Sequence, residues 1–108
     1  MTFTLEAGAA VALDTLVTPT PHGIASRVLA KTTAGNLTMF AFDAGQGLTE
    51  HTSPFEAFVL VVQGTLTLTV GGVAVAATPG TMVRMPANIP HAVDALEPAR
   101  MLLIMLRD

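Results

Sequence analysis

Two histidines, His51 and His91, are the side chains of this sequence that are best suited to chemistry. A neutral imidazole binds metal ions, and its pKa near neutrality also suits it to proton transfer. Ser53 follows His51 by two residues and offers a hydroxyl that can orient a ligand. Ala57, where a further ligand would be sought, offers nothing. If folding brings the two imidazoles together, these residue types allow a metal site, a proton-transfer site or a small-molecule pocket.

Composition excludes several other classes of function. The chain has no cysteine, which rules out disulfides, thiolate metal sites and cysteine nucleophiles. Its five basic residues form no cluster and the net charge is −3, so we expect no nucleic-acid partner. No phosphate-binding loop, nucleophile elbow or dinucleotide fingerprint is present. No apolar run reaches the length of a membrane span, and the first residues make a poor secretory signal, so we expect a cytoplasmic protein without membrane contacts.

The elements that must position the histidines are short β-rich runs separated by turn residues. The expected strands are 24–33, 37–44, 55–62, 65–70, 73–78, 81–85, 91–96 and 100–106. Gly71-Gly72 is a strong hairpin signal, because both residues tolerate positive φ. The last run could be helical by composition, but its shortness and its place after several strands favour a strand. The segment AGAAVALDTL near the N-terminus is compatible with a strand or with one or two helical turns.

This spacing predicts an all-β fold, a small antiparallel barrel or sandwich. Only 12% of the residues are charged, about half the usual share. The run FVLVV is apolar at every position, whereas a strand with one solvated face alternates. One face would fill the barrel and the other would lie against another subunit. We therefore expect a homodimer.

The glycines, prolines and histidines of this chain resemble the two motifs of the cupins, a family of small barrels built as a double-stranded β-helix with a jelly-roll topology. The matching positions of the first motif are Gly45, His51, Ser53, Ala57 and Gly64, and those of the second are Gly80, Pro86, Asn88 and His91. Asn88 replaces a glycine, a mild change because Asn also adopts the left-handed conformation. The resemblance implies one cupin domain over residues 1–108, with 1–23 as an N-terminal arm and the barrel motifs within 37–106.

In metal-binding cupins, two histidines and a glutamate of the first motif and the histidine of the second hold one divalent ion. Here Ser53 and Ala57 occupy two of those four positions, which leaves His51 and His91. Two imidazoles bind zinc, nickel or copper weakly, since catalytic zinc sites typically use three protein ligands. The resemblance thus allows a weakly held divalent ion such as Zn, Ni, Fe or Cu on these two residues.

Neighbouring polar residues were weighed by strand parity, because successive side chains point to opposite faces. Glu56 is offset by one residue from the glutamate position, so we expect it to point outward. Gln63 has the parity of His51 and Ser53, and we include it with His51, Ser53 and His91 as a ligand-binding candidate facing the barrel mouth. His22, in a Pro-rich loop, could close over the mouth as a third ligand but is more simply a loop residue. Arg84 is expected at the surface.

Methionines fall on or beside several expected strands, and they are Met39, Met82, Met85, Met101 and Met105. Core packing is their simplest role. The alternative is that one or two of them line an apolar pocket beside the histidines.

Three functions remain open, because a fold does not fix an activity. The first is binding of a small molecule of unknown identity at a reduced site of His51 and His91. The second is an enzyme, either a metal-dependent dioxygenase, isomerase or cyclase, or a metal-free epimerase or isomerase that uses the histidines for proton transfer. The third is a structural or regulatory dimer in which the histidines have no role.

Overall fold

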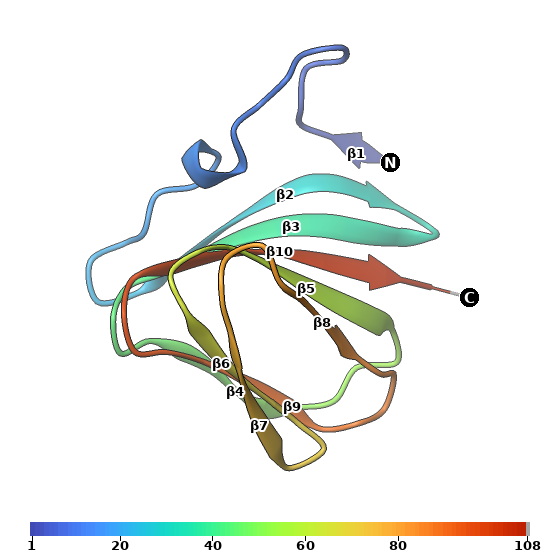
Figure 1. Ribbon diagram of the computed structural model, residues 1–108. Helices are drawn as coiled ribbons and strands as arrows, with labels where there is room; N and C mark the ends of the chain where they lie inside the picture. The colour runs from blue at the N-terminus through green and yellow to red at the C-terminus, as the bar shows by residue number, and fades with distance from the viewer. Residues whose placement is uncertain (108) are drawn as a thin grey trace.

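The computed structural model describes residues 1–107 and consists of β-strands joined by turns, with one 3-10 turn (Figure 1). The strands are β1 (Thr2–Phe3), β2 (Ile24–Thr32), β3 (Gly35–Phe42), β4 (Gly47–His51), β5 (Glu56–Gln63), β6 (Leu66–Val70), β7 (Val73–Ala77), β8 (Met82–Met85), β9 (His91–Ala95) and β10 (Ala99–Leu106). The 3-10 turn η1 spans Leu13–Thr15. None of the described residues forms a helix that is long and apolar enough to cross a membrane.

Two antiparallel sheets face each other. The larger has the strand order β1-β2-β3-β10-β5-β8, and the smaller has the order β4-β9-β6-β7. Figure 1 shows the smaller sheet beneath the β10, β5 and β8 side of the larger one. The all-β barrel of jelly-roll type that the sequence predicts is therefore confirmed.

The core lies between the sheets and follows the two-residue period of the strands. On β5, Ala57, Val59 and Val61 are buried against the smaller sheet, while Phe58 and Leu60 point outward and are half-buried. FVLVV is therefore apolar on an inner face that fills the core and on an outer face that the turn η1 covers only in part. Leu66, Leu68 and Val93 fill the core from the opposite sheet, and Met101 adds to it from β10.

The hairpin and strand predictions hold in most places. Gly71 and Gly72 have φ values of 58° and 83° and join β6 to β7, as expected for a two-residue turn with both central residues left-handed. The C-terminal run forms β10, hydrogen-bonded between β3 and β5 in the middle of the larger sheet. Two strands were not expected from the sequence, and they are β4, which ends at His51, and the two-residue β1.

The N-terminal segment begins with β1, which extends the edge of the larger sheet beside β2, and it then runs through η1 to the start of β2 (Figure 1). Two arginines attach this segment to the sheet. Arg27 donates hydrogen bonds to the carbonyl oxygens of Thr4 at 3.2 Å and Leu16 at 3.4 Å, and Arg100 Nε donates to that of Val17 at 3.0 Å. The ambiguous segment AGAAVALDTL contains only the short turn η1, which lies against β5.

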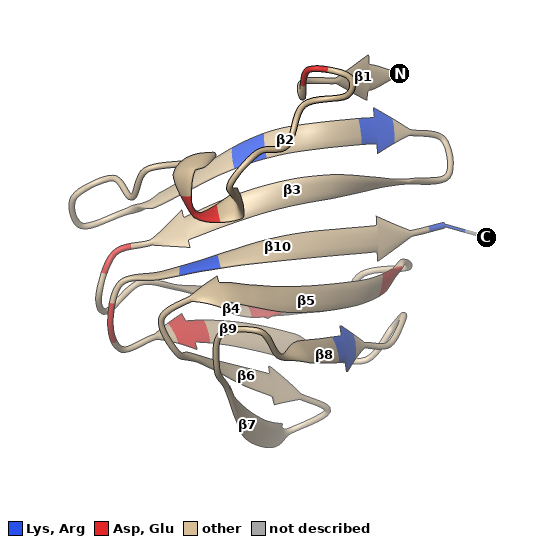
Figure 2. Ribbon diagram, turned by 45° about the horizontal axis from the view of Figure 1, so that its top comes forward, with Lys and Arg blue, Asp and Glu red and all other residues tan. Residues whose placement is uncertain are grey.

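Charged residues are few, and Figure 2 shows most of them in turns or near strand ends. The strands β3, β6 and β7 carry none. The interior between the two sheets is mostly apolar, and the buried polar side chains of the described residues are His91 and Thr38.

Candidate functional site

His51 and His91 face each other across neighbouring strands. They are register partners of the antiparallel pair β4 and β9. Directly opposed residues of such a pair place their Cβ atoms roughly 4.5–5.5 Å apart on the same face of the sheet. The imidazole centroids lie 4.3 Å apart with an interplanar angle of 73°, and the two Nε2 atoms are separated by 3.1 Å.

A bulge in β4 aims His51 into the space between the sheets. Leu48 pairs with Val93, and the next recorded pair is His51 with His91, so three steps along β4 match two along β9. In a regular strand Leu48 and His51 would point to opposite faces. The extra residue returns His51 to the inner side, and both it and Leu48 line the same pocket.

The outer nitrogens of both rings contact backbone carbonyls. His51 Nδ1 lies 2.7 Å from the carbonyl oxygen of Thr49, and His91 Nδ1 lies 3.1 Å from that of Ile89. A carbonyl oxygen only accepts hydrogen bonds, so this geometry favours the tautomer in which each Nδ1 carries the proton and donates. In the neutral rings both Nε2 atoms then present lone pairs to each other. The pair is consequently arranged to receive a cation or a hydrogen-bond donor.

The two imidazoles differ in solvent exposure. His51 is exposed at the rim, whereas His91 is only 5% exposed. Burial lowers the pKa of His91 below its usual value, and the nearby His51 lowers it further, against the effect of the hydrogen bond to Ile89. His91 is therefore held in the neutral form that accepts a proton or binds a metal.

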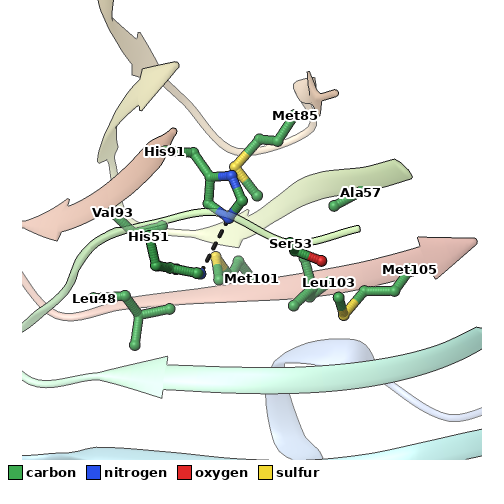
Figure 3. Close-up of a pocket in the computed structure, with 10 residues that line it drawn as sticks. All are labelled: Leu48, His51, Ser53, Ala57, Met85, His91, Val93, Met101, Leu103 and Met105. Carbon is green, nitrogen blue, oxygen red and sulfur yellow. Dashed lines mark hydrogen bonds between the residues drawn. The ribbon is translucent and has the colours of Figure 1, made fainter. Parts of the chain in front are cut away.

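A small pocket adjoins the histidine pair (Figure 3). Its volume is about 40 Å³, and its lining residues are Leu48, His51, Ser53, Ala57, Met85, His91, Val93, Met101, Leu103 and Met105. No charged side chain is among them. This volume accommodates roughly two or three water molecules, so only an ion, a very small molecule or one group of a larger molecule fits without movement.

Ser53 and Ala57 occupy the side of this pocket next to the histidines. Ser53 Oγ accepts a hydrogen bond from the backbone N–H of Phe55 at 3.1 Å, which leaves its own proton free to be donated. Ala57 is 2% exposed and contributes only a methyl group. The backbone of Ser53 also accepts a hydrogen bond from the N–H of Asn88 at 2.7 Å, which joins the two loops that carry the histidines.

Comparison with known proteins now identifies the fold family. The family profile for the cupin domain matches residues 38–105, more than half of the chain. The chain belongs to the cupin family.

Solved structures agree with this assignment. A conserved protein of unknown function from Streptococcus pyogenes is 29% identical, with 100% of this chain and 96% of that chain covered and a TM-score of 0.92. A cupin superfamily protein from Desulfitobacterium hafniense is 23% identical, covers 96% and 95% of the two chains and has a TM-score of 0.90. KdgF from Halomonas sp. is 26% identical, covers 79% and 82% and has a TM-score of 0.72. No curated protein sequence matches significantly.

The cupin motifs adopt the backbone that their spacing implies. Asn88, in a glycine position of the second motif, has a φ of 64° and so takes the left-handed conformation expected of it. The turn of residues 86–90 delivers the chain to His91 at the start of β9.

The donor atoms of the pocket do not fit the divalent ion that the cupin motifs imply. Ser53 and Ala57 replace two of the four ligands, and no carboxylate lines the pocket. Among the residues that the structure describes, no three His, Cys, Asp or Glu side chains are grouped so that they could hold a metal ion. The remaining protein donors are two neutral imidazoles, one hydroxyl and the methionine sulfurs.

Gln63 lies elsewhere, and the expectation that it faces the barrel mouth is wrong. It is exposed at the far end of β5, where its side-chain oxygen accepts a hydrogen bond from Arg100. The register with β10 shifts there, because Arg100 pairs with Gln63 while the next residue, Met101, pairs with Val61. This bulge turns Gln63 to the other face, so counting parity from Ala57 fails at the end of the strand.

Three further polar residues have roles outside the pocket. His22 is a loop residue whose backbone N–H donates to the Asp43 carboxylate at 2.7 Å. This bond, followed by one from the N–H of Ala44, lowers the pKa of Asp43. Glu56 points outward, as parity predicts, and pairs with exposed Arg84 at 2.6 Å.

Of the methionines, Met85, Met101 and Met105 line the pocket, while Met39 and Met82 do not. The alternative expectation was that one or two of the five would line a pocket, and three do. Leu48, Val93 and Leu103 also line it, although nothing in the sequence singled them out. The run GLTEH, which ends at His51, has a single apolar side chain and does not alternate, so no hydrophobic pattern marks β4 or the bulge that aims the histidine.

Proposed function

We propose that this protein is a small-ligand-binding cupin whose ligand docks on the Nε2 atoms of His51 and His91. The observation that carries the proposal is that the two Nε2 atoms face each other at 3.1 Å, while both Nδ1 atoms are engaged with carbonyl oxygens. Two opposed acceptors in an apolar setting repel each other. A ligand with a positive charge or a hydrogen-bond donor removes that repulsion.

The shape and polarity of the pocket limit the ligand further. About 40 Å³ of apolar space admits an ion with its waters, or one small group of a larger molecule. Ser53 adds a hydroxyl that can donate to an acceptor atom of the same ligand. An anionic ligand is disfavoured, because no cationic side chain lines the pocket.

Nuclear magnetic resonance of the histidine nitrogens tests this proposal. In metal-free protein near pH 8, both rings should carry their proton on Nδ1. Addition of a cation, or of a small molecule that donates a hydrogen bond, should shift the Nε2 signals of both residues. The His51→Gln and His91→Gln variants should lose binding, whereas the matched loop variant His22→Gln should keep it. Protonation of either Nε2 in the neutral rings, with no response to cations or to small amines and alcohols, would contradict the proposal.

Proton transfer is a second candidate, favoured by the different exposure of the two rings. His51 is at the rim and His91 is buried, so the pair connects solvent to the pocket interior. A metal-free isomerase would use such a pair to move a proton on a carbon next to a carbonyl group. Deuterium incorporation from heavy water into small hydroxy-carbonyl compounds, absent in His91→Gln, would support this activity; equal incorporation by both proteins would reject it.

We also propose a homodimer formed through the outer face of β5 and β10. Phe58 and Leu60 are register partners of Ile104 and Leu102, so the four side chains form one apolar patch, and all are half-buried. The turn η1 lies against β5 and covers only part of this face. Covering such a patch with its copy would remove apolar surface from water.

A further inference from the structure

The pocket combines the two imidazoles with an unusual number of thioethers. Met85, Met101 and Met105 all line it, and no carboxylate or thiolate is present. Thioether sulfur is a soft, neutral ligand that selects soft metal ions, above all Cu(I), whereas carboxylates suit harder cations. These imidazole and thioether donors do not suit a hard divalent cation, but they are the ligand types that bind a soft metal ion.

The histidines are oriented as metal ligands are. A metal-binding imidazole typically donates its other N–H to a carbonyl or carboxylate, which fixes the ring and makes the ligating nitrogen more basic. Both rings do this, through the carbonyls of Thr49 and Ile89. With imidazole–metal bonds of roughly 2.0–2.1 Å, a separation of 3.1 Å between Nε2 atoms corresponds to an angle of roughly 100° at a shared ion. The pair thus has the spacing of two neighbouring ligands of one metal.

Two of the thioethers share the buried part of the pocket with the histidines. Figure 3 shows the side chains of Met101 and Met85 among the residues that line the pocket together with His51 and His91. Both side chains are almost fully buried, at 0% and 2% exposure. Met105 is less available, because its sulfur accepts a hydrogen bond from the Asn36 amide at 3.8 Å.

Charge favours a monovalent ion over a divalent one. All the donors are neutral, so a bound cation keeps its full charge in an apolar setting, and the cost of removing it from water rises steeply with that charge. We propose that the pocket binds one soft monovalent metal ion, Cu(I), through Nε2 of His51 and His91 and the thioether of Met101, with Met85 as the fourth ligand. This inference rests on the proposed function, because it names the ligand of the same histidine pair.

Competition with a chromophoric Cu(I) chelator under anaerobic conditions tests the proposal on the full chain. Wild-type protein should take up one Cu(I), should bind Ag(I) at the same site, and should bind Zn(II) much more weakly. Met101→Leu and Met85→Leu conserve volume and should each weaken Cu(I) binding roughly 10- to 100-fold while leaving Zn(II) binding unchanged. Met82→Leu is the matched control, because Met82 is exposed on the same strand as Met85, and it should have no effect.

X-ray absorption of the Cu(I)-loaded wild-type protein gives a result that needs no variant, and it should show both nitrogen and sulfur in the first coordination shell. The proposal is overturned if Zn(II) binds as tightly as Cu(I), if the shell contains no sulfur, or if Met85→Leu/Met101→Leu binds Cu(I) like wild type. The proposed function survives these results if another ligand still shifts both Nε2 signals. The proposed function and the copper site are both contradicted only if no cation and no hydrogen-bond donor shifts the Nε2 signals of the two histidines.

Discussion

His51 and His91 are directly opposed on β4 and β9, and their Nε2 atoms lie 3.1 Å apart with both Nδ1 protons committed to backbone carbonyls. In the neutral rings, the two Nε2 atoms are both hydrogen-bond acceptors and repel each other. A cation or a hydrogen-bond donor bound between them would remove this repulsion. Because His91 is buried, the form without a bound ligand depends on this ring staying neutral.

The stability of the metal-free protein should depend on pH through His91. Burial holds its folded pKa below the usual 6.5, so below that pH the unfolded chain binds a proton that the folded chain resists. Stability should therefore fall as the pH drops below about 6.5, with no contribution from this group at higher pH. Chemical denaturation at pH 7.5, 6.5 and 5.5 measures it.

His91→Asn should remove most of this dependence, and His22→Asn should leave it intact. Asp43 and Glu56 act in a more acidic range, because their folded pKa values are lowered from those of ordinary carboxylates and the stability that they contribute is lost only as the pH falls through that range. An unchanged slope in His91→Asn would show that the titrating group lies elsewhere.

Restoring the two missing cupin ligands should create a divalent site. Ser53 and Ala57 line the same pocket as the histidines, so Ser53→His with Ala57→Glu places four donors around one point. The double variant should bind Zn(II) or Ni(II) orders of magnitude more tightly than wild type, and its metal-free form should be destabilised by the buried carboxylate. Isothermal titration after chelator treatment measures both metals.

Ser53→His with Ala57→Gln is the matched control for this experiment, because it preserves size and removes the negative charge. It should gain much less affinity. Wild-type protein that keeps a stoichiometric divalent ion through dialysis would show that the natural donor set is already sufficient.

The proposed dimer should dissociate when a charge enters the apolar patch on β5. Leu60 lies between Leu102 of β10 and Met82 of β8 on the outer face. Leu60→Asp should convert a dimer into a monomer in light scattering at micromolar concentration, because the carboxylate would be buried without a partner. Val73→Asp, on exposed β7 of the other sheet, should not change the mass. A monomeric wild-type protein contradicts the proposal directly.

Glu56 should matter more to stability than its exposed partner Arg84. Its carboxylate accepts hydrogen bonds from Arg84 Nε at 2.6 Å and from the backbone N–H of Ala87 at 2.7 Å. Exposed ion pairs contribute little, but loss of Glu56 also releases the turn that leads to His91. Glu56→Ala should therefore lower the melting temperature more than Arg84→Ala. Glu56→Gln should fall between them, and equal effects of the two alanine variants would mean that the bond to Ala87 contributes nothing.

Much of the fold could be predicted because its signals are local. Gly71-Gly72 marks a hairpin through backbone freedom that other residues lack, and the β-rich runs between turn residues predict most of the strands. The spacing around His51 and His91 also indicated the family and the two principal residues of the pocket. Each of these features depends on a few residues that are close together in the sequence, so it can be recognised without knowledge of the fold.

The tertiary structure decided where side chains point and what their atoms face. A bulge in β4 turns His51 inward, and a bulge near Gln63 turns that residue away, although both have the same parity in the sequence. A bulge arises from pairing with a distant strand, so no local pattern marks it. The protonation of Nδ1 depends likewise on the carbonyls of Thr49 and Ile89, which the folded strands bring against the rings. The sequence thus identified the two histidines of the site, and long-range pairing determined which other residues line it and that the two Nε2 atoms meet there.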